Sequence, residues 1–322
     1  MENPGLSALV AARADALAYY SPYYFLRQFA AARQQELFGT GAAARWGQGT
    51  GAETFHFRAS PAATEVRWLL QQLAWDSDYF GTSMYRLFTG LFEARAATAE
   101  LVAAATGLRQ ELADRHGAFY AFGVVPAEDV RLLQALTGAG WRLVETRMTY
   151  YRDQMLAFDY PRHPVRVAMI AEAGHIGRVA AAARNAYDRF HADAWFGEAR
   201  ADAYLARYAE NTVAAGLAAV VLVPDAPELP VDSFLAISDL PGDAAVLGAR
   251  LSRVLLTAVG PTNRGWHVKL VAEALHRAQA LGHAAVLMTT QAGNHAVVRT
   301  CEKLGFRLGA TSHVLACHSR GR

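Results

Sequence analysis

Hydrophobic and polar residues alternate along the chain with two periodicities, one typical of helices and one typical of strands. Over the first 38 residues apolar positions recur at helical spacing, and glycine-rich stretches at 39–41 and 47–51 predict a break after this helical segment. From about residue 55 onward, short apolar runs that predict strands alternate with helical segments. This alternation predicts a fold of the α/β (α+β) class.

The first half of the chain contains four predicted strands and two predicted helices. The strands cover 66–73, 84–93, 118–125 and 141–151. One helix covers 94–115, and a second is predicted to begin at Pro126, a favoured first residue, and to run to Leu136. Residues 153–164, with Pro161 and Pro164, have the composition of a linker.

The second half follows the same pattern more clearly. Its predicted strands cover 165–170, 217–223, 234–240, 249–259, 284–290 and 306–317. Its predicted helices cover 174–186, 198–211, 264–281 and 294–304.

The two halves match each other when the sequence is offset by 165 positions. The segment 118–151 then overlies 283–316, so that one strand–helix–strand series covers another. Gly140-Trp141-Arg142-Leu143 aligns with Gly305-Phe306-Arg307-Leu308, and Asp129 aligns with Asn294. The few identities carry less weight than the shared order and length of the elements, which favours an internal duplication.

Composition and charge narrow the classes of protein that fit. The 322 residues suffice for two domains, and 53% hydrophobic content with 19% charged residues predicts a folded chain. The formal net charge of +2 predicts no binding of nucleic acid or of anionic membranes. The longest apolar run, Ala214–Val223, is about half of a membrane span. Cys301 and Cys317 are too few for a disulfide framework, and no spacing predicts a metal site.

A glycine-containing loop between the strand ending at Val259 and the following helix predicts a phosphate-binding site. Its sequence is Val259-Gly260-Pro261-Thr262-Asn263-Arg264-Gly265-Trp266-His267-Val268-Lys269. Backbone N–H groups at a helix N-terminus bind phosphate oxygens, and the helix dipole adds to the attraction. Arg264 and Lys269 bring positive charge to the same place. The alternative is an ordinary strand–loop–helix turn.

The residues that follow this loop resemble a known family. After the next strand come Gln291-Ala292-Gly293-Asn294, a helix, and Cys301-Glu302-Lys303-Leu304-Gly305-Phe306. The series resembles the GCN5-related N-acetyltransferase (GNAT) superfamily over residues 165–318. In that family the pyrophosphate loop has the form Q/R-x-x-G-x-G/A, which falls here on Arg264 to Lys269, and a later Asn…Tyr…Gly-Phe motif falls on Asn294, Cys301 and Gly305-Phe306.

The resemblance implies a fold, a cosubstrate and a set of binding residues. The implied fold is a GNAT acyl-CoA-binding domain with a mixed central sheet over 161–322, preceded by a degenerate, truncated GNAT-like lobe over 51–160 and a helical extension over 1–50. The implied cosubstrate is acetyl-CoA, with no metal. The residues implied to bind it are Ala258, Val259, Arg264, Gly265, Trp266, His267, Val268, Lys269 and Asn294. Asn294 is equally suited to be a helix N-cap, and the two roles are compatible.

Three positions depart from the family pattern. His267 replaces a glycine and Lys269 a glycine or alanine, so their side chains are expected to crowd the pyrophosphate unless the loop is displaced. His267 is equally well explained as a surface histidine that caps a helix turn, and Lys269 could pair with a CoA phosphate. Cys301 stands where many members have the tyrosine that protonates the departing thiolate. It is therefore a candidate general acid, or alternatively a small core residue on a buried helix face.

Three short segments resemble acetyltransferases that act on nucleotide-activated amino sugars such as dTDP-4-amino-4,6-dideoxygalactose (dTDP-fucosamine). They are Tyr187–Asp193, Trp75–Gly81 and Glu145–Tyr151. The resemblance implies a nucleotide-sugar acceptor, with products that feed surface polysaccharides. It is consistent with a cytoplasmic enzyme, and a homodimer could form by pairing of the strand 306–317.

Acyl transfer to an amine requires a base, donors for the oxyanion and an acid for the thiolate. In the family fold the oxyanion donor is a backbone N–H on the central strand, here near Ala258 or Val259. His191 and Asp193 form the best-placed titratable pair for the base, since an imidazole titrates near neutral pH. Two alternatives are a turn in which Asp193 caps the segment from Trp195, and a role of both residues in holding the substrate.

The remaining candidate substrate-binding residues are Arg189 and Phe190. Arg189 could contact a diphosphate, or be a solvated charge. Phe190, Trp195 and Phe196 could stack on a base or sugar, or form core. The sequence therefore predicts an acetyl-CoA-dependent N-acetyltransferase for a nucleotide-activated amino sugar. The alternatives are a GNAT enzyme for another amine, and a non-catalytic acyl-CoA-binding protein.

Overall fold

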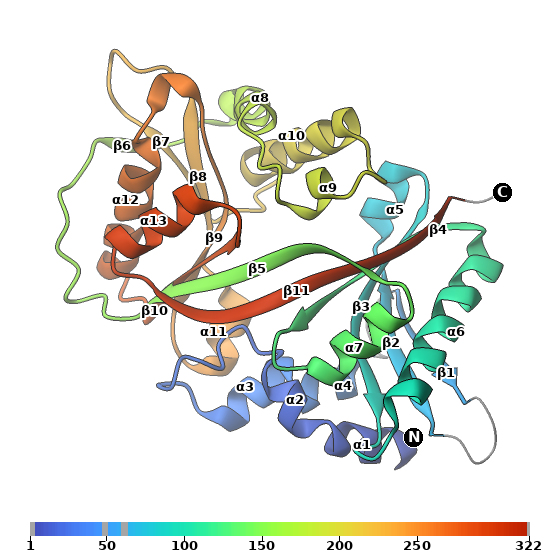
Figure 1. The fold of residues 1–322 in the computed structure, drawn as a ribbon. Coiled ribbons are helices and arrows are strands. Elements are labelled where there is room, and N and C mark those ends of the chain that lie inside the picture. The colour runs from blue at the N-terminus through green and yellow to red at the C-terminus, as the bar shows by residue number, and fades with distance from the viewer. Residues whose placement is uncertain (1–3, 47–50, 59–63, 321–322) are drawn as a thin grey trace. The chain divides into compact units, whose positions relative to one another are not determined.

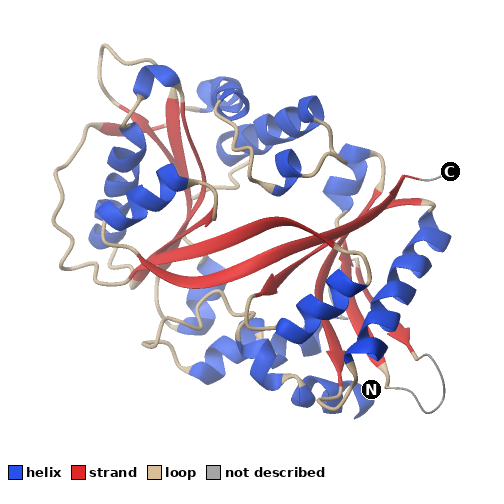
Figure 2. Cartoon of the chain, in the orientation of Figure 1, coloured by secondary structure: helices blue, strands red, loops and turns tan. Residues whose placement is uncertain are grey.

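The computed structural model describes residues 4–46, 51–58 and 64–320, which divide into two compact units. Unit 1 comprises Met1–Thr146 together with Thr311–Arg322, and unit 2 comprises Arg147–Ala310. The chain can be followed by colour in Figure 1, and its helices and strands in Figure 2. The ranges 1–50, 51–160 and 161–322 stay a prediction about domain organisation, and each unit is described below by itself.

Unit 1 begins with short helices, as the apolar spacing predicts for the first 38 residues. They are α1 (Pro4–Ala12), α2 (Ala14–Ala18), α3 (Ala31–Phe38) and α4 (Thr40–Trp46). Helix α4 lies where the glycines predict a break. Its tertiary contacts explain the difference, because Trp46 stacks on Phe88 at 4.8 Å between ring centroids and donates its Nε1–H to the Leu70 carbonyl at 2.8 Å. The second glycine-rich stretch lies largely outside the described residues.

The sheet of unit 1 is mixed, with one parallel pair. Its own strands are β1 (Ala52–Phe57), β2 (Val66–Gln72), β3 (Ser83–Phe92) and β4 (Ala118–Pro126). Strands β3 and β4 run parallel because helix α6 (Thr98–His116) connects them, and helices α5 (Ala74–Phe80) and α7 (Val130–Gly138) complete the unit. The predicted helix start at Pro126 is wrong: Pro126 ends β4, paired with Ser312, and Asp129 is the N-cap of α7.

The strands of unit 2 also pair in a mixed arrangement of similar design. Its strands are the later part of β5 (Arg142–Arg152), β6 (Val165–Val167), β7 (Val220–Pro224), β8 (Ser233–Ser238), β9 (Leu251–Val259) and β10 (Ala285–Gln291). Its α-helices are α8 (Ala173–Ala182), α9 (Arg189–Ala192), α10 (Glu198–Ala214), α11 (Pro241–Leu247), α12 (Trp266–Ala280) and α13 (His295–Lys303). Strands β9 and β10 are parallel, and α12 connects them.

The offset of 165 positions recurs in the geometry of the two units. The parallel pairs end at Gly123 in β4 and at Met288 in β10, which are 165 positions apart. Asp129 and Asn294 are both N-caps, of α7 and α13 respectively, and each side chain accepts a hydrogen bond from the backbone N–H three residues later. These shared details support the duplication that the sequence indicates.

The last strand of each repeat pairs with a strand of the other repeat. In unit 1, β11 (Arg307–Arg320) pairs antiparallel with β4 from Ser312 to Arg320, although it belongs to the second repeat. In unit 2, residues 147–152 of β5 pair antiparallel with β10, although β5 belongs to the first repeat. The strand suggested for pairing between copies of the chain is therefore paired within the chain.

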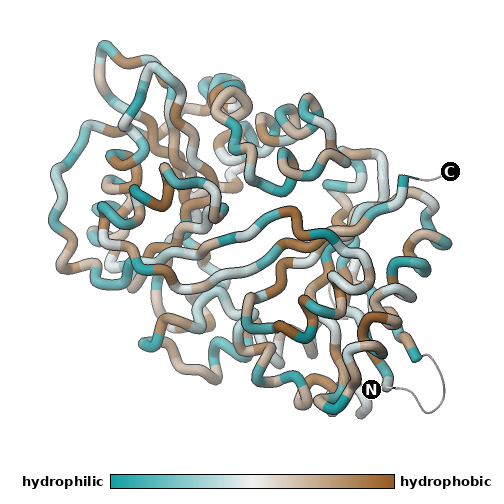
Figure 3. The backbone as a smooth tube through the Cα atoms, in the orientation of Figure 1, coloured by the Kyte–Doolittle hydropathy of each residue, from teal (hydrophilic) through white to brown (hydrophobic). Residues whose placement is uncertain are grey.

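Each unit buries its own apolar core. Figure 3 colours the hydrophobic residues of the chain brown. In unit 1, Trp68, Phe92 and Leu108 belong to one cluster between the sheet and α6. In unit 2, Leu275 and Met288 belong to a cluster beneath α12, and a second cluster forms between α8 and the strands on the other face. Side chains that are fully removed from water in this way supply most of the folding free energy.

Candidate functional site

The candidate site of unit 2 begins where two parallel strands separate. The pairing of β9 with β10 runs from Leu251 and Ala285 to Val254 and Met288, and it ends there. The remaining residues of the two strands diverge into a fork. A register shift between Ala236 and Ile237 in β8 marks the same level of β9. Because strands that separate leave backbone polar groups without a ladder partner, such a fork can accept a ligand that carries amides.

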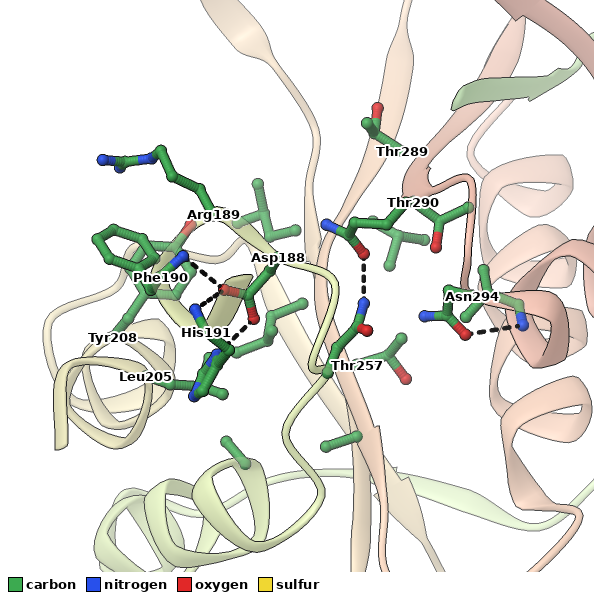
Figure 4. Close-up of a pocket in the computed structure, with 18 of the residues that line it drawn as sticks. Asp188, Arg189, Phe190, His191, Leu205, Tyr208, Thr257, Thr289, Thr290 and Asn294 are labelled. Atoms are coloured by element: carbon green, nitrogen blue, oxygen red, sulfur yellow. Dashed lines mark hydrogen bonds and ion pairs between the residues drawn. The ribbon is translucent and has the colours of Figure 1, made fainter. Parts of the chain in front are cut away.

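A cavity of about 530 Å³ lies at this fork. Figure 4 shows Arg189, Phe190 and His191 on one side of it, Thr257 on β9, and Thr290 and Asn294 on the other side. The polar residues that line it are Arg147, Asn185, Asp188, Arg189, His191, Tyr204, Tyr208, Arg253, Thr257, Thr289, Thr290, Gln291 and Asn294. A cavity of this size, with polar groups at defined places, is typical of small-molecule sites.

His191 is held at the cavity by two carboxylates. Its Nδ1 lies 2.7 Å from an Asp188 carboxylate oxygen, and its Nε2 lies 3.1 Å from an Asp202 carboxylate oxygen. Asp188 also accepts the backbone N–H groups of Phe190 and His191, and thereby caps α9. The side chain of His191 is 5% exposed. Both ring nitrogens of His191 are therefore engaged, so neither offers a lone pair for proton transfer in this arrangement.

The other predicted acceptor residues have different surroundings. Asp193 is buried, does not line the cavity, and accepts the backbone N–H of Trp195 at 3.1 Å, as the alternative of a structural turn predicts. Arg189 is buried with its guanidinium 4.1 Å from the centroid of the Phe190 ring. Phe190 packs against Phe196 at 4.8 Å between ring centroids. The aromatic cluster is therefore in part core, with Phe190 reaching the cavity wall.

The predicted phosphate-binding loop leads from β9 into α12. Gly265, the N-cap of α12, has φ +90°, a left-handed conformation that favours glycine. The first turn of α12 contains no acidic residue and has no side-chain cap, so its N–H groups are open to an anion. Arg264 is exposed beside it. Asp232 is the one carboxylate that the described contacts place on the loop, and it accepts the backbone N–H of Thr262 at 2.9 Å.

The side chains expected to crowd this loop are turned elsewhere. The ring of His267 is buried against α13, with Nδ1 2.8 Å from the Thr300 hydroxyl oxygen, so it is not a surface histidine. Thr300 donates its own proton to the Ala296 carbonyl, so His267 Nδ1 is the donor in this contact. Lys269 places its ammonium 4.6 Å from the Trp266 ring centroid. Neither side chain therefore has to occupy the anion position.

His267 makes an acid-sensitive contribution to stability. Burial lowers its pKa from 6.5 to about 4. Because the folded pKa lies below the unfolded one, the contribution is complete above pH 6.5 and is lost as the pH falls toward 4. We expect the free energy of unfolding to fall by about 3 kcal/mol more between pH 7 and pH 4 in the wild type than in His267→Gln, measured by urea denaturation. Equal pH profiles for the two proteins would contradict this account.

Cys301 lies in the core and not at the cavity. It is 0% exposed, packs in the cluster with Met288 and Leu270, and is absent from the cavity wall. Burial raises the pKa of its thiol to about 12. Its role as general acid stays a prediction, while its position matches the alternative of a small core residue.

The variant Cys301→Ala distinguishes these two roles. We expect kcat within about 2-fold of wild type and a loss of stability of about 1 kcal/mol, because only a small buried group is removed. Steady-state kinetics and thermal unfolding measure the two effects. A loss of kcat of about 10²–10⁴-fold would instead assign proton donation to Cys301.

Several cavity residues were not singled out by the sequence. Arg253 is a charged residue within the predicted strand 249–259, and a charge in this largely apolar segment is the available signal. Arg147 belongs to the segment Glu145–Tyr151, which was singled out only as a whole. Asn185 donates its side-chain amide to Gln291, which connects the loop before α9 to the end of β10. Such a contact between distant residues leaves no local pattern in the sequence.

The predicted residues therefore divide into two groups. Ala258, Asn294, Arg189, Phe190 and His191 line the cavity. The loop residues Arg264, Gly265, Trp266, His267, Val268 and Lys269, together with Val259, Cys301 and Asp193, do not line it. The segment Trp75–Gly81 forms α5 and its C-cap in unit 1.

No group of three or more His, Cys, Asp or Glu side chains in the described part of the chain is arranged to hold a metal ion. Among the helices built from described residues, none combines the length and the hydropathy that a membrane crossing requires.

Comparison with known proteins shows the fold. No protein-family model matches the sequence. No curated protein matches it either. Among solved structures, a GCN5-related N-acetyltransferase from Sphaerobacter thermophilus is similar with a TM-score of 0.55 at 11% identity, over 97% of this chain and 92% of the other. A tandem GNAT protein from the clavulanic acid biosynthesis pathway is similar with a TM-score of 0.50 at 13% identity, over 97% and 95%.

A third similar structure is a GCN5-related glucosamine N-acetyltransferase region within a fungal multi-domain GH3 β-N-acetylglucosaminidase. Its TM-score is 0.56 at 12% identity, over 98% of this chain and 37% of that protein. Together with the forked strands, these similarities show that the chain has a tandem GNAT fold. The predicted fold class is confirmed.

Proposed function

We propose that unit 2 is an acetyl-CoA-dependent N-acetyltransferase whose acceptor amine belongs to an anionic small molecule, a nucleotide-activated amino sugar of the dTDP-4-amino-dideoxyhexose type. The observation that carries the proposal is the cavity at the fork of β9 and β10, which combines a slot between strands with three arginines. The GNAT fold is consistent with the cosubstrate but does not identify the acceptor.

The residues present fit acetyl-CoA. The separated strands would hold its amide-containing arm, with Ala258, Val259 and Asn294 beside it. The uncapped start of α12, with Arg264 exposed next to it, would hold the pyrophosphate. Bound there, acetyl-CoA supplies an activated acetyl thioester.

The charge of the cavity favours an anionic acceptor over a polycation. Arg147, Arg189 and Arg253 line it, whereas Asp188 is the one acidic residue among the described lining residues. The Asp188 carboxylate is already engaged by two backbone N–H groups and by His191. Polyamines and similar acceptors need free carboxylates, while a diphosphate needs guanidinium groups.

The chain's own groups would carry out the proton transfers. The amine proton would pass to His191 once its Asp202 contact opens, or to a water chain, because the amine of an amino sugar is less basic than a lysine side chain. Asp193 would act indirectly, by capping the turn at Trp195 that follows His191. A backbone N–H of Ala258 or Val259 would stabilise the oxyanion.

Arg253 provides the test of acceptor charge. It lies half-buried on β9 at the cavity, and no ion pair connects it to another described residue. For Arg253→Gln we expect KM for the nucleotide sugar to rise about 10–100-fold with kcat nearly unchanged, because one charge-assisted hydrogen bond is lost. The control is the same amino sugar without its diphosphate, for which KM should not change. A similar KM increase for both acceptors would contradict the proposed role.

A further inference from the structure

Unit 1 contains the same fork of parallel strands as unit 2. Strands β3 and β4 are paired from Ser83 and Phe119 to Leu87 and Gly123, and the pairing ends there. Asp129, at the start of α7, is in the position that Asn294 has in unit 2. The first repeat has therefore retained the backbone geometry that forms an acyl-CoA cleft in the second.

This fork is filled by the chain itself. Arg13, between α1 and α2, is 5% exposed and donates Nε–H to the carbonyl of Gly90, just beyond the last paired residue of β3. Its guanidinium forms an ion pair with Asp129 and lies 4.2 Å from the centroid of the Phe92 ring. A fully buried charge is stable only when it is paired in this way.

Tyr20, which follows α2, completes the network. Its hydroxyl donates to the Asp129 carboxylate at 2.9 Å and accepts from the Thr89 hydroxyl at 3.2 Å. Asp129 thus receives bonds from two residues of the N-terminal segment, and Thr89 and Gly90 of β3 contact the same two residues.

Apolar contacts hold the same segment on the strands. Leu9, Val10 and Leu17 of α1 and α2 belong to one buried cluster with Leu69 of β2 and Leu91 of β3. The N-terminal helices therefore pack on β2 and β3 through a buried apolar cluster.

The N-terminus of the helix next to the fork also has its partners within the chain. In α6, which corresponds to α12, the Glu100 carboxylate accepts the backbone N–H of Ala97 at 2.9 Å, so the helix carries its own anion. The loop before α6 directs its Ala94 and Ala96 carbonyls at the guanidinium of Arg131. In α12 the corresponding first turn has neither an acidic residue nor a side-chain cap.

We propose that the acyl-CoA cleft of the first repeat has become a binding site for the chain's own N-terminal segment, with Arg13 and Tyr20 in the strand fork and Glu100 at the helix start in place of the cofactor. Unit 1 then binds no acyl-CoA, and the chain binds one molecule, in unit 2. The comparison of the two clefts rests on the proposed function, but the occupancy of the first cleft does not.

The first experiment maps acetyl-CoA binding by hydrogen exchange and mass spectrometry on the full chain. At saturating acetyl-CoA we expect protection in β9, α12, β10 and the start of α13, and none in residues 88–92, 97–101 and 127–132 of unit 1. Protection in these three segments would overturn the proposal. Absence of protection everywhere would contradict the proposed function of unit 2 and support a closed cleft in unit 1.

The second experiment needs no ligand and compares two arginines of the N-terminal segment. In Arg13→Ala we expect exchange in α1–α2 and in residues 88–92 to rise together by about 100-fold, because Asp129 loses its buried partner. Arg27→Ala, at an exposed position, should leave both segments unchanged. If Arg13→Ala does not fold, Tyr20→Phe removes a single hydroxyl and should raise both by about 5-fold. Faster exchange in α1–α2 with no change in residues 88–92 would overturn the proposal.

Discussion

Replacing Asp129 by alanine is expected to lower the free energy of unfolding by about 3–5 kcal/mol, the largest effect on stability that we predict. The side chain of Asp129 is 1% exposed, and it pairs with Arg13, whose side chain is 5% exposed. Removing the carboxylate leaves a buried guanidinium without its counter-charge, and also removes the cap of α7. Urea denaturation followed by circular dichroism measures the loss.

Two further variants control this measurement. Asp114→Ala removes a carboxylate from an exposed position of α6 and should cost less than about 0.5 kcal/mol. Asp129→Asn retains an acceptor for the cap and for Tyr20 but loses the charge, so its loss should be intermediate. If Asp129→Ala were no more destabilising than Asp114→Ala, the network of Arg13 and Asp129 would not stabilise unit 1.

Reversing the charge of Arg264 is expected to have the largest effect on cosubstrate binding. Arg264 is exposed beside the uncapped start of α12, where the proposal places the pyrophosphate. We expect Kd for acetyl-CoA to rise about 10-fold in Arg264→Ala and about 100-fold in Arg264→Glu, since a charge-assisted contact is first lost and then becomes repulsive. Titration calorimetry measures both values.

The matched control for Arg264→Glu is Arg207→Glu. Arg207 lies on α10 with its side chain 63% exposed, and the cavity wall does not include it. Its reversal should leave Kd within about 2-fold, because an exposed charge remote from the ligand is screened by salt. Equal effects of the two reversals would mean that the loop before α12 does not bind the pyrophosphate.

The sequence predicted those features that depend on local pattern. Apolar periodicity located the strands β9 and β10 and the helix α12, because each buries a regular face. The glycine at 265 marked the start of α12, since its φ of +90° excludes most other residues. Asn294 was expected as an N-cap and accepts the Val297 N–H.

Features that depend on tertiary contacts could not be predicted in this way. Helix α4 forms despite Gly41 because Trp46 packs on β3, and Pro126 pairs in β4 where its proline character suggested a helix start. The sequence leaves His267 open between a residue that crowds the pyrophosphate and a surface histidine, because its contact with Thr300 from another helix has no local signal. The partner of Arg13 is 116 positions away, so no local pattern indicated the closed fork of unit 1.

The order of the strands is a further feature of this kind. Both β5 and β11 were predicted as strands, but their partners were not. Strand β5 pairs with β10 of the second repeat, and β11 pairs with β4 of the first repeat. Hydrophobic alternation alone does not encode this choice of partner.

We propose that this chain transfers an acetyl group from acetyl-CoA to an amine at the fork of β9 and β10. The most direct test incubates the protein with acetyl-CoA and a dTDP-4-amino-4,6-dideoxyhexose, and measures free CoA and acetylated sugar together by mass spectrometry. We expect one CoA released for each amide formed, and a loss of both products in Arg264→Glu at low acetyl-CoA. Tight acetyl-CoA binding without amide formation on this sugar or on any other amine would contradict the account and would indicate a non-catalytic acyl-CoA-binding protein.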